Sequence, residues 1–459
     1  MKTDTIAAIA TAMAGSGIGI VRISGEEAVS ITDQIFHMPG GKKLSDMETH
    51  TIHYGHIRDG EEVIDEVMVL LMRGPRSYTR EDTVEIDCHG GVYVMKRILE
   101  TVIKYGARPA EPGEFTKRAF LNGRIDLSQA ESVIDVISAK NEFALKSSMK
   151  QLSGAVSDAV KEIRGEILHE IAFIESALDD PEHISLDGYG ERLELTIEGA
   201  VDRIEKLLAS SDNGRILKEG ISTVIVGKPN AGKSSLLNTL LGEERAIVTE
   251  IAGTTRDVLE EQINLNGIIL NIIDTAGIRD TDDIVEKIGV DKARKYVKDA
   301  DLILYVVDAS TNLDENDGEI MELLHGRRTI VLLNKSDLTP LTTAEDIRVH
   351  VDKDCPVISI SAREQKGIDV LTEQIRKMFF RGEVTFNDEV YITNIRHKTA
   401  LQEALSSLHL VEQSIADGMP EDFYSIDLMN AYEVLGTIIG EAVEDDLVNE
   451  IFSKFCMGK

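Results

Sequence analysis

A glycine-rich segment between a strand and a helix constrains the fold more than any other feature of the sequence. It reads Gly227-Lys228-Pro229-Asn230-Ala231-Gly232-Lys233-Ser234 and directly follows the apolar run Thr223–Val226. This pattern is typical of a P-loop, in which glycines let backbone N–H groups surround a β-phosphate. The Lys233 ammonium then reaches the β- and γ-phosphates, and the Ser234 hydroxyl can ligate Mg²⁺. The segment predicts a phosphate-binding α/β domain.

Short apolar runs alternate with helical stretches on both sides of this loop, between Ile221 and Phe380. Such alternation is the signature of a doubly wound, mostly parallel sheet. The predicted strands are Thr223–Val226, Ile268–Ile273, Leu302–Val307, Ile330–Leu333 and Val357–Ile360.

Helical periodicity surrounds this α/β unit, from about Phe115 to Ser211 and again after Tyr391. Ser128 and Glu131 have the spacing of a capping box at the start of one such helix. The α/β unit is therefore predicted to be inserted into a helical domain that is discontinuous in sequence. Residues before about 119 read as mixed α/β. The predicted strands there are Gly19–Ser24, Val63–Met72 and Thr83–Cys88, and the predicted helices are Glu26–Phe36 and Val92–Tyr105. We expect domains at 1–119, 120–215, 216–380 and 381–459.

Three further motifs follow the P-loop in the order that a nucleotide site requires. Asp274-Thr275-Ala276-Gly277 closes a predicted strand, so that its aspartate can hold Mg²⁺ through water and its last amide can meet the γ-phosphate. Asn334-Lys335-Ser336-Asp337 ends another strand, and a carboxylate there can accept hydrogen bonds from guanine N1 and N2, which adenine cannot offer. Ser361-Ala362 completes the base-binding set. Together the motifs predict a Ras-like P-loop domain that hydrolyses GTP.

The water that attacks the γ-phosphate needs a residue to orient it. Ras-like enzymes use a glutamine after the DTAG motif, but Ile278 occupies that position here and cannot do so. Glu286, a few residues further on, is a candidate. The alternative is that Glu286 only begins the helix Glu286–Lys298, where a carboxylate favours the helix N-terminus.

Negative charge in the transition state also needs a cation, often an arginine finger. A monovalent cation held by the Asn230 side chain and by backbone carbonyls of Thr249–Thr255 is another option, and Thr255 is the expected second Mg²⁺ ligand. The residues expected to contact GTP are Asn230, Ala231, Gly232, Lys233, Ser234, Ser235, Thr249, Glu250, Ile251, Ala252, Gly253, Thr254, Thr255, Asp274, Thr275, Ala276, Gly277, Asn334, Lys335, Asp337, Ser361 and Ala362.

The composition of the chain limits the kinds of molecule that it can bind directly. The 459-residue chain is 42% hydrophobic and 28% charged, as in a folded globular protein, and its formal net charge is −32. Non-specific affinity for nucleic acid comes mostly from Lys and Arg, so we expect a basic partner to hold any RNA. Acidity that merely keeps the protein soluble is the alternative. Three scattered cysteines fit a reducing compartment, and no apolar run reaches membrane-spanning length, so we expect a cytoplasmic protein without a membrane partner.

The sequence resembles the MnmE (TrmE) family, the tRNA-modification GTPases. The resemblance covers essentially the whole chain. Outside the GTPase motifs it is carried by Gly19-Ile20-Val21-Arg22-Ile23-Ser24-Gly25, by Pro112-Gly113-Glu114-Phe115 with Arg118-Ala119-Phe120-Leu121-Asn122, and by the ending Phe455-Cys456-Met457-Gly458-Lys459.

The resemblance implies an N-terminal α/β domain that dimerises and binds a 5-formyl- or 5,10-methylene-tetrahydrofolate. Arg22, Glu85, Arg124 and Lys459 would be the folate contacts. It also implies that K⁺, with ligands Asn230, Thr249, Ile251 and Thr254, promotes dimerisation of the GTPase domain and hydrolysis. Glu286 would then orient the water.

The resemblance also implies an FAD-containing MnmG-type partner, which forms a heterotetramer or larger complex with this chain and supplies most of the tRNA contacts. Together the two proteins of the family attach an aminomethyl or carboxymethylaminomethyl group to C5 of the wobble uridine of certain tRNAs. The terminal segment would bring Lys459 and Cys456 to the folate site. Cys456 is either a nucleophile or acid activated by a nearby cation, or a buried and inert thiol. Other readings of the whole chain are a ribosome-assembly GTPase, a folate-dependent transferase without GTP control, and a folate-sensing switch.

Overall fold

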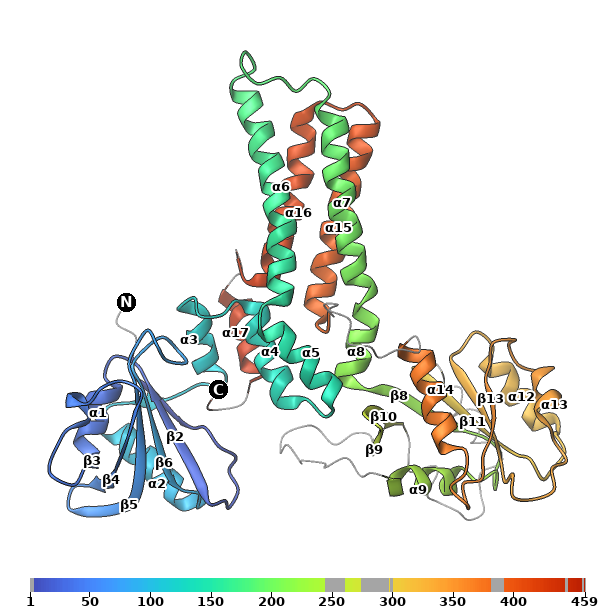
Figure 1. Ribbon diagram of the computed structural model, residues 1–459, viewed down its shortest axis with the longest axis horizontal. Helices are drawn as coiled ribbons and strands as arrows, with labels where there is room; N and C mark the ends of the chain where they lie inside the picture. Colours follow the sequence, from blue (N-terminus) through green and yellow to red (C-terminus); the bar gives the residue numbers. More distant parts are fainter. Residues whose placement is uncertain are drawn as a thin grey trace. The chain divides into compact units, whose positions relative to one another are not determined.

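The computed structural model describes residues 4–243, 261–273, 297, 300–380, 392–441, 445–455 and 458. The chain forms two compact units (Figure 1). The first contains Met1–Ile137, Met149–Val201 and Ala400–Lys459, and the second contains Ser138–Ser148 and Asp202–Thr399. Segments far apart in sequence therefore share one unit, which confirms the prediction of an α/β unit inserted into a discontinuous helical domain. The four-part division of the chain stays a prediction.

The first unit begins with a seven-stranded sheet in the order β3-β4-β5-β6-β2-β1-β7. Neighbouring strands are antiparallel except for β1 and β7, which are parallel. The strands are β1 (Ile6–Ile9), β2 (Ile18–Ser24), β3 (Phe36–His37), β4 (Thr51–Asp59), β5 (Glu62–Met72), β6 (Thr83–His89) and β7 (Arg108–Pro109).

Two helices cover one face of this sheet, α1 (Ala28–Ile35) and α2 (Val92–Lys104), and a 3₁₀ turn, Leu44–Asp46, follows β3. Alternation along β6 decides which side chains face them, because successive residues of a strand point to opposite faces. Val84 and Ile86 are fully buried under the helices, whereas Glu85 and Asp87 point to the other face. That second face carries the residues from which a ligand site can be built.

A short helix, α3 (Glu114–Leu121), lies on this second face, where Phe115 packs with Ile6 and Ala8. A buried ion network fixes it. The Arg118 guanidinium donates to Glu81 at 3.1 Å and to Glu114 and Asp4 at 3.0 Å, and its side chain is only 8% exposed. Because removing one partner of such a network leaves a buried charge uncompensated, the network holds α3 firmly over the sheet.

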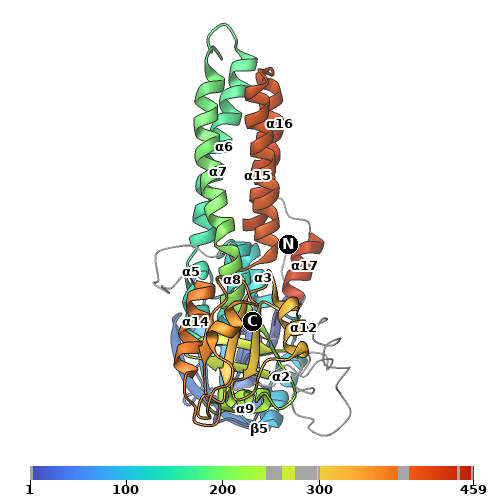
Figure 2. The same ribbon diagram turned by 90° about the vertical axis from the view of Figure 1, so that its right-hand side faces the viewer.

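The helical part of the first unit is built around the packing of α6 along α16 (Figures 1 and 2). Buried apolar side chains recur every three or four residues on both helices, as in Ile167, Ile171 and Ile174 on α6. The Arg164 Nε donates to the Tyr432 carbonyl at 3.0 Å, and its guanidinium lies 4.0 Å from the centre of the Tyr432 ring. The helices are α4 (Leu127–Ser138), α5 (Glu142–Leu152), α6 (Ala155–Asp179), α7 (Tyr189–Ala209), α15 (Ile395–Ala416), α16 (Glu421–Ile439) and α17 (Asp445–Ser453), of which α5, α7 and α15 continue into the second unit.

The predicted capping box at the start of α4 is wrong by two residues. The helix begins at Leu127, so Ser128 already lies inside it. Asp126 accepts from the Gln129 N–H at 3.0 Å, and the Gln129 side chain accepts from the Asp126 N–H at 3.0 Å. Ser128 instead donates to the Asp126 carboxylate at 2.7 Å. Asp126 rather than Ser128 is the N-cap because an ionised acceptor at the N-terminus also interacts favourably with the helix dipole.

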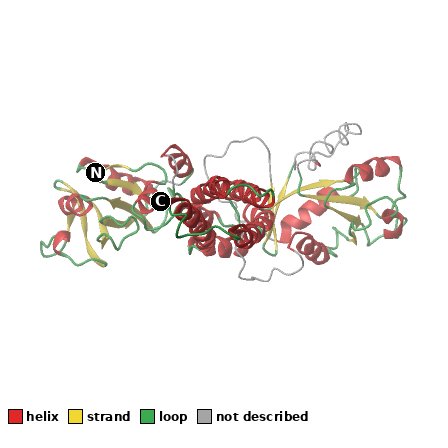
Figure 3. Cartoon of the chain, turned by 90° about the horizontal axis from the view of Figure 1, so that it is seen from above, coloured by secondary structure: helices red, strands yellow, loops and turns green. Residues whose placement is uncertain are grey.

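The second unit contains a six-stranded sheet in the order β13-β12-β11-β8-β10-β9, parallel except for the pair β9–β10. Helices lie on both sides of its strands (Figure 3). The strands are β8 (Ile221–Val226), β9 (Glu261–Leu265), β10 (Ile268–Ile272), β11 (Leu302–Asp308), β12 (Thr329–Asn334) and β13 (Val357–Ser359), and the helices are α8 (Ser211–Glu219), α9 (Lys233–Glu243), α12 (Glu315–Leu324), α13 (Ala344–Arg348) and α14 (Ile368–Phe380).

The central strand β11 shows why both faces are covered, because all its residues are buried. Leu302, Leu304 and Val306 belong to the core under α9 and α14, whereas Ile303 and Tyr305 belong to the core under α12. The prediction of a doubly wound sheet is confirmed. The edge strand β9 was not predicted, although a two-residue turn, Asn266-Gly267 with φ of 51° and 88°, marks the hairpin. In the described part of the chain, no helix is long and apolar enough to cross a membrane.

The junction between α16 and α4 depends on a glycine. Gly440 has φ 87° at the C-terminus of α16, and a Cβ there would lie 2.7 Å from the Phe120 ring and 2.9 Å from Leu127 Cβ. Gly418 has φ 63°, but a Cβ there would meet nothing within 4 Å. Both glycines avoid the roughly 1–2 kcal/mol that the left-handed conformation costs other residues. Only at Gly440 would a side chain also collide with neighbouring residues.

We therefore expect Gly440→Ala to destabilise the bundle by about 1–3 kcal/mol more than Gly418→Ala does, because the added methyl overpacks a filled junction. Hydrogen exchange of α16 peptides, measured by mass spectrometry on the full chain, reports the local opening free energy. Equal exchange rates in the two variants would show that the close contacts at Gly440 relax without cost.

Candidate functional sites

The P-loop lies between β8 and α9, at the carboxyl end of a central strand. Its backbone has positive φ at Gly227 (150°), Asn230 (59°) and Gly232 (99°), as expected for a loop whose amides turn toward one point. Lys233, Ser234 and Ser235 form the first turn of α9. A helix N-terminus with such a loop before it is a ready-made site for a phosphate group.

Asn334, at the end of β12, joins three of the predicted motifs. Its Nδ2 donates to the Ala231 carbonyl at 2.9 Å, and its Oδ1 accepts from the Ala362 N–H at 3.0 Å. A Cβ on Gly232 would lie 2.1 Å from the Asn334 Nδ2, so only glycine fits there. The P-loop, the Asn-Lys-Ser-Asp motif and Ser361-Ala362 thus meet at one buried amide, that of Asn334.

The Lys233 ammonium contacts the backbone of the P-loop. Its Nζ donates to the carbonyls of Gly227 at 2.8 Å and Lys228 at 2.7 Å, and burial lowers its pKa. Lys228, in turn, is held by Asp317 at 2.6 Å and by Asp314 at 2.9 Å. The second residue of the P-loop is therefore tied to the N-terminus of α12, a contact that the sequence analysis missed.

The residues predicted to recognise the base include an exposed carboxylate, that of Asp337. Asp337 accepts from the Ser361 hydroxyl at 2.7 Å, and this hydrogen bond holds the pKa of the carboxyl below its ordinary value. Lys335 forms an ion pair with Asp308, which ends β11 next to β12. Asp308 was not predicted, although it ends a strand that neighbours the motif. An ionised Asp337 at this position can accept two hydrogen bonds from N–H groups on one edge of a base.

Several predicted residues lie outside the part of the chain that the structure describes, so their placement stays a prediction. They are Thr249, Glu250, Ile251, Ala252, Gly253, Thr254, Thr255, Asp274, Thr275, Ala276, Gly277, Glu286, Cys456 and Lys459. Of the expected Mg²⁺ and K⁺ ligands, Ser234 and Asn230 are described. A hydroxyl and an amide carbonyl beside the phosphate loop are suitable oxygen donors for these ions.

A second cluster of polar residues lies on the second face of the N-terminal sheet, the face that also carries α3. Arg22 on β2 pairs directly with Glu85 on β6, and their side chains form an ion pair at 2.7 Å with 14% and 16% exposure. The Arg22 guanidinium also lies 5.4 Å from the centre of the Tyr78 ring and 5.6 Å from that of Phe115. Two of the predicted folate contacts are thus adjacent, beside two aromatic rings.

The third predicted folate contact, Arg124, lies on the same aromatic ring. Its guanidinium is 4.6 Å from the centre of the Tyr78 ring, and it donates to the Tyr78 carbonyl at 3.3 Å. Tyr78 is therefore flanked by two arginines. No sequence signal identified Tyr78, whereas Phe115 belongs to a segment that carried the family resemblance. Arginines around an aromatic ring suit a ligand that combines a flat ring with carboxylates.

The end of the chain reaches this cluster. The Gly458 carbonyl accepts from Arg22 at 3.1 Å. Gly458 has φ 90°, and a Cβ there would lie 2.4 Å from the Ile9 carbonyl, so glycine is required for the close approach to β1. The role of Lys459, which follows Gly458 in sequence, stays a prediction.

Asp87 is a further polar group on this sheet face that the sequence analysis missed. It lies two residues beyond Glu85 on β6, opposite Ile20 and Met68 on the neighbouring strands. Its Oδ1 is buried without a hydrogen-bond partner in the described structure. Burial and the nearby Glu85 carboxylate raise its pKa. A buried acceptor without a partner is costly to keep, so the site has unused capacity for a ligand N–H.

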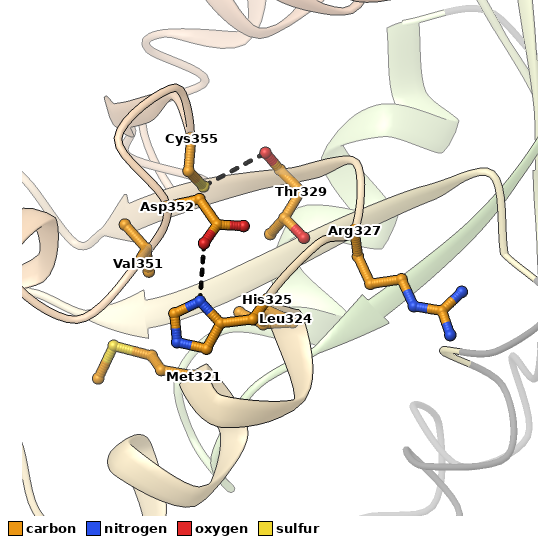
Figure 4. Close-up of a pocket in the computed structure, with 8 residues that line it drawn as sticks. All are labelled: Met321, Leu324, His325, Arg327, Thr329, Val351, Asp352 and Cys355. Atoms are coloured by element: carbon orange, nitrogen blue, oxygen red, sulfur yellow. Dashed lines mark hydrogen bonds and ion pairs between the residues drawn. The ribbon is translucent and has the colours of Figure 1, made fainter.

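A small cavity in the second unit contains none of the predicted residues (Figure 4). Its volume is about 10 Å³, room for one water at most. His325 and Asp352 approach to 2.7 Å beside it, and burial raises the pKa of the Cys355 thiol to about 11. A thiol with so high a pKa is protonated at neutral pH and is a poor nucleophile.

Known proteins resemble this chain along its whole length. A family model described as "GTP-binding protein TrmE N-terminus" matches residues 5–124, and one described as "MnmE helical domain" matches residues 127–456. The tRNA modification GTPase MnmE of Lachnoclostridium phytofermentans is 62% identical over 100% of both chains. The chain belongs to the MnmE family.

Other members of the MnmE family agree with this assignment. The proteins of the same name from Bacillus subtilis and Clostridioides difficile are 48% and 50% identical over 99% of this chain, and over 100% and 99% of their own lengths. Among solved structures, the G domain of the T. maritima FeoB iron transporter matches 34% of this chain and 97% of its own, at 24% identity and a TM-score of 0.26. So low a TM-score adds nothing to the assignment. The match of the MnmE helical model across 127–456 agrees with the discontinuous bundle.

Asp87 leads to a prediction about pH. Its raised pKa in the folded protein means that the charged form destabilises the fold above the ordinary carboxyl pKa of about 4. Asp87→Asn should therefore raise the thermal midpoint at pH 7.5, and the gain should shrink as the pH is lowered, because the folded carboxyl gains its proton before an unfolded one does.

Asp59 is the matched control of opposite sign. It accepts from the Lys104 ammonium at 2.7 Å, and this hydrogen bond lowers its pKa. The ionised Asp59 stabilises the fold above about pH 4, and this stabilisation is lost only when the pH falls below that value. Asp59→Asn should therefore lower the thermal midpoint equally at pH 7.5 and pH 4.5. A gain for Asp87→Asn that did not change with pH would contradict the assigned cause.

Proposed function

We propose that this chain hydrolyses GTP within a tRNA-modification system that acts on the wobble uridine. With an FAD-containing MnmG-type partner, it adds an aminomethyl or carboxymethylaminomethyl group to C5 of that base, using a one-carbon unit from a tetrahydrofolate. The observation that carries the proposal is the 62% identity, over the full length of both chains, to a protein named tRNA modification GTPase MnmE. The two residue clusters on the described parts of the chain support it independently.

The P-loop cluster supports GTP as the substrate. Backbone amides of the loop and the Lys233 ammonium would bind the phosphates, and Asn334 holds the loop against the base-binding segment. The Asp337 carboxylate would accept from guanine N1 and N2. Ser234 and Thr255 would hold Mg²⁺, which neutralises phosphate charge.

The residues that complete hydrolysis are proposed from the family resemblance. Asn230, Thr249, Ile251 and Thr254 would hold K⁺, which supplies positive charge near the transferred phosphoryl group, and Glu286 would orient the attacking water. K⁺ binding would favour pairing of two GTPase domains in a homodimer.

The cluster on the N-terminal sheet supports a tetrahydrofolate site. Arg22, Arg124 and Lys459 would bind the carboxylates of the ligand, and Glu85 would accept from N–H groups of its pterin ring. The aromatic Tyr78 ring between two arginines fits a flat ligand. Cys456 would lie in the same terminal segment. The fixed position of Gly458 against β1 supports a role of this segment in the site.

The tRNA would be held mainly by the partner. A net charge of −32 gives this chain little intrinsic attraction for polyanions. We propose a homodimer that joins the FAD protein in a heterotetramer or larger complex, with the domains divided at 1–119, 120–215, 216–380 and 381–459.

Base recognition provides one prediction. Asp337→Asn should weaken GTP binding by at least tenfold and improve binding of xanthosine triphosphate, because an amide can donate to the 2-oxo group of xanthine. Titration with fluorescent nucleotides measures both affinities. Asp352→Asn, an exposed carboxylate beside the small cavity, should leave them unchanged. Unaltered GTP affinity in Asp337→Asn would contradict the assigned role.

The whole proposal is tested by the nucleosides of tRNA. In cells that lack this chain, mass spectrometry of digested tRNA should show loss of the C5-aminomethyl-type uridines. The wild-type gene should restore them, and a Lys233→Ala variant should not, because the phosphates lose their ammonium. Unchanged nucleosides would refute the proposal and favour a folate-sensing or ribosome-assembly switch.

A further inference from the structure

The outer side of α16 exposes a stripe of large apolar residues. Met419, just before the helix, is 38% exposed, Phe423 is 45%, Ile426 is 66% and Met429 is 39%. Phe423, Ile426 and Met429 are spaced three residues apart on α16 (Glu421–Ile439), which places them on one side of the helix, and Met419 lies just before its N-cap. The opposite side, which packs against α6, is formed by Tyr424, Leu428, Ala431 and Leu435. We call the exposed set the α16 stripe.

The surroundings of the α16 stripe are acidic. Glu421 and Asp422 lie between its first two members, and exposed Glu433 lies beyond its last. From Thr399 to Ser453 the sequence has twelve Asp and Glu and no Lys or Arg.

The connection between α6 and α7, Asp179–Tyr189, lies at the end of the bundle where α16 begins, in both views (Figures 1 and 2). A Cβ on Gly190 would lie 3.6 Å from Ile415, near the end of α15, which agrees with this placement. That connection also has four acidic residues and no Lys or Arg.

The apolar stripe and its acidic surroundings together indicate which kind of partner can bind to α16. An anionic membrane or a nucleic acid would be repelled by the acidic rim, and a second copy of the same face would bring acid against acid. Contiguous exposed apolar surface rimmed by charge is typical of a protein-binding site, and Met and aromatic residues are enriched in the centres of such sites. A protein surface with an apolar centre and a basic rim is complementary.

We propose that the α16 stripe docks a basic protein, and that this protein is the partner that carries the tRNA. This inference rests on the proposed function, in which an FAD-containing partner holds the polyanion and must therefore be basic where it does so. The apolar stripe supplies the contact area, and the acidic rim accelerates and orients association.

The test measures the affinity of the purified full-length chain for the purified FAD-containing partner by calorimetry. Ile426→Asp should weaken binding at least tenfold, because it places a charge at the centre of the contact. Leu195→Asp, at a 70% exposed position on α7, is the matched control and should bind like the wild type. Basal GTP hydrolysis should be unchanged in both variants, which excludes misfolding as the cause.

Charge is tested separately. The double variant Glu421→Lys and Asp422→Lys should bind more weakly than the wild type, and its affinity should fall less steeply with salt. Wild-type affinity in Ile426→Asp, or an equal loss in Leu195→Asp, would overturn the α16 stripe while leaving the proposed function intact. Absence of any binding by the wild-type chain would overturn the proposed function and this inference with it.

Discussion

The packing of α6 against α16 is the contact on which the architecture of the first unit depends. These helices are separated by more than 200 residues of sequence, and the α/β unit lies between them in the chain. Ile167, Ile171 and Ile174 bury a continuous apolar side of α6, and Arg164 ties its first half to the Tyr432 carbonyl. Because that pairing closes a very long loop, it must gain enough from burial to offset the closure entropy. The inserted unit can then fold around its own two cores.

Each candidate site uses one buried polar group to join segments that are distant in sequence. Asn334 satisfies a donor and an acceptor from two different loops, so the P-loop and the Ser361-Ala362 segment cannot separate without leaving buried groups unpaired. Arg22 does the same on the N-terminal sheet, where it bonds Glu85 and the Gly458 carbonyl. In both cases the group that binds a neighbouring segment also lies where a ligand is expected.

Much of this could be predicted from sequence, and the failures have physical reasons. The strands of the doubly wound sheet were found because buried strands are continuous apolar runs, and the phosphate loop because its glycines and lysine have fixed spacing. The capping box at α4 failed because Asp126 and Gln129 have the same spacing as Ser128 and Glu131, and the ionised Asp126 also interacts favourably with the helix dipole. The sequence analysis did not identify Tyr78 and Asp87, because a single residue carries no spacing signal. Their place in the site depends on neighbours that are distant in sequence.

The distribution of charge connects these observations. Within the described residues, the cations of the two clusters are engaged at short range: Arg22 with Glu85, Lys335 with Asp308, and Lys233 with loop carbonyls. Basic residues are thus concentrated where a small anionic ligand could be bound at close range, while the surface of α16 is left acidic. A protein built this way can select phosphates and carboxylates through geometry, since it has no broad positive field that would attract nucleic acid indiscriminately. In the proposed function, recognition of the tRNA would then fall to a basic partner, and the acidic surface of α16 is where we propose that this partner docks.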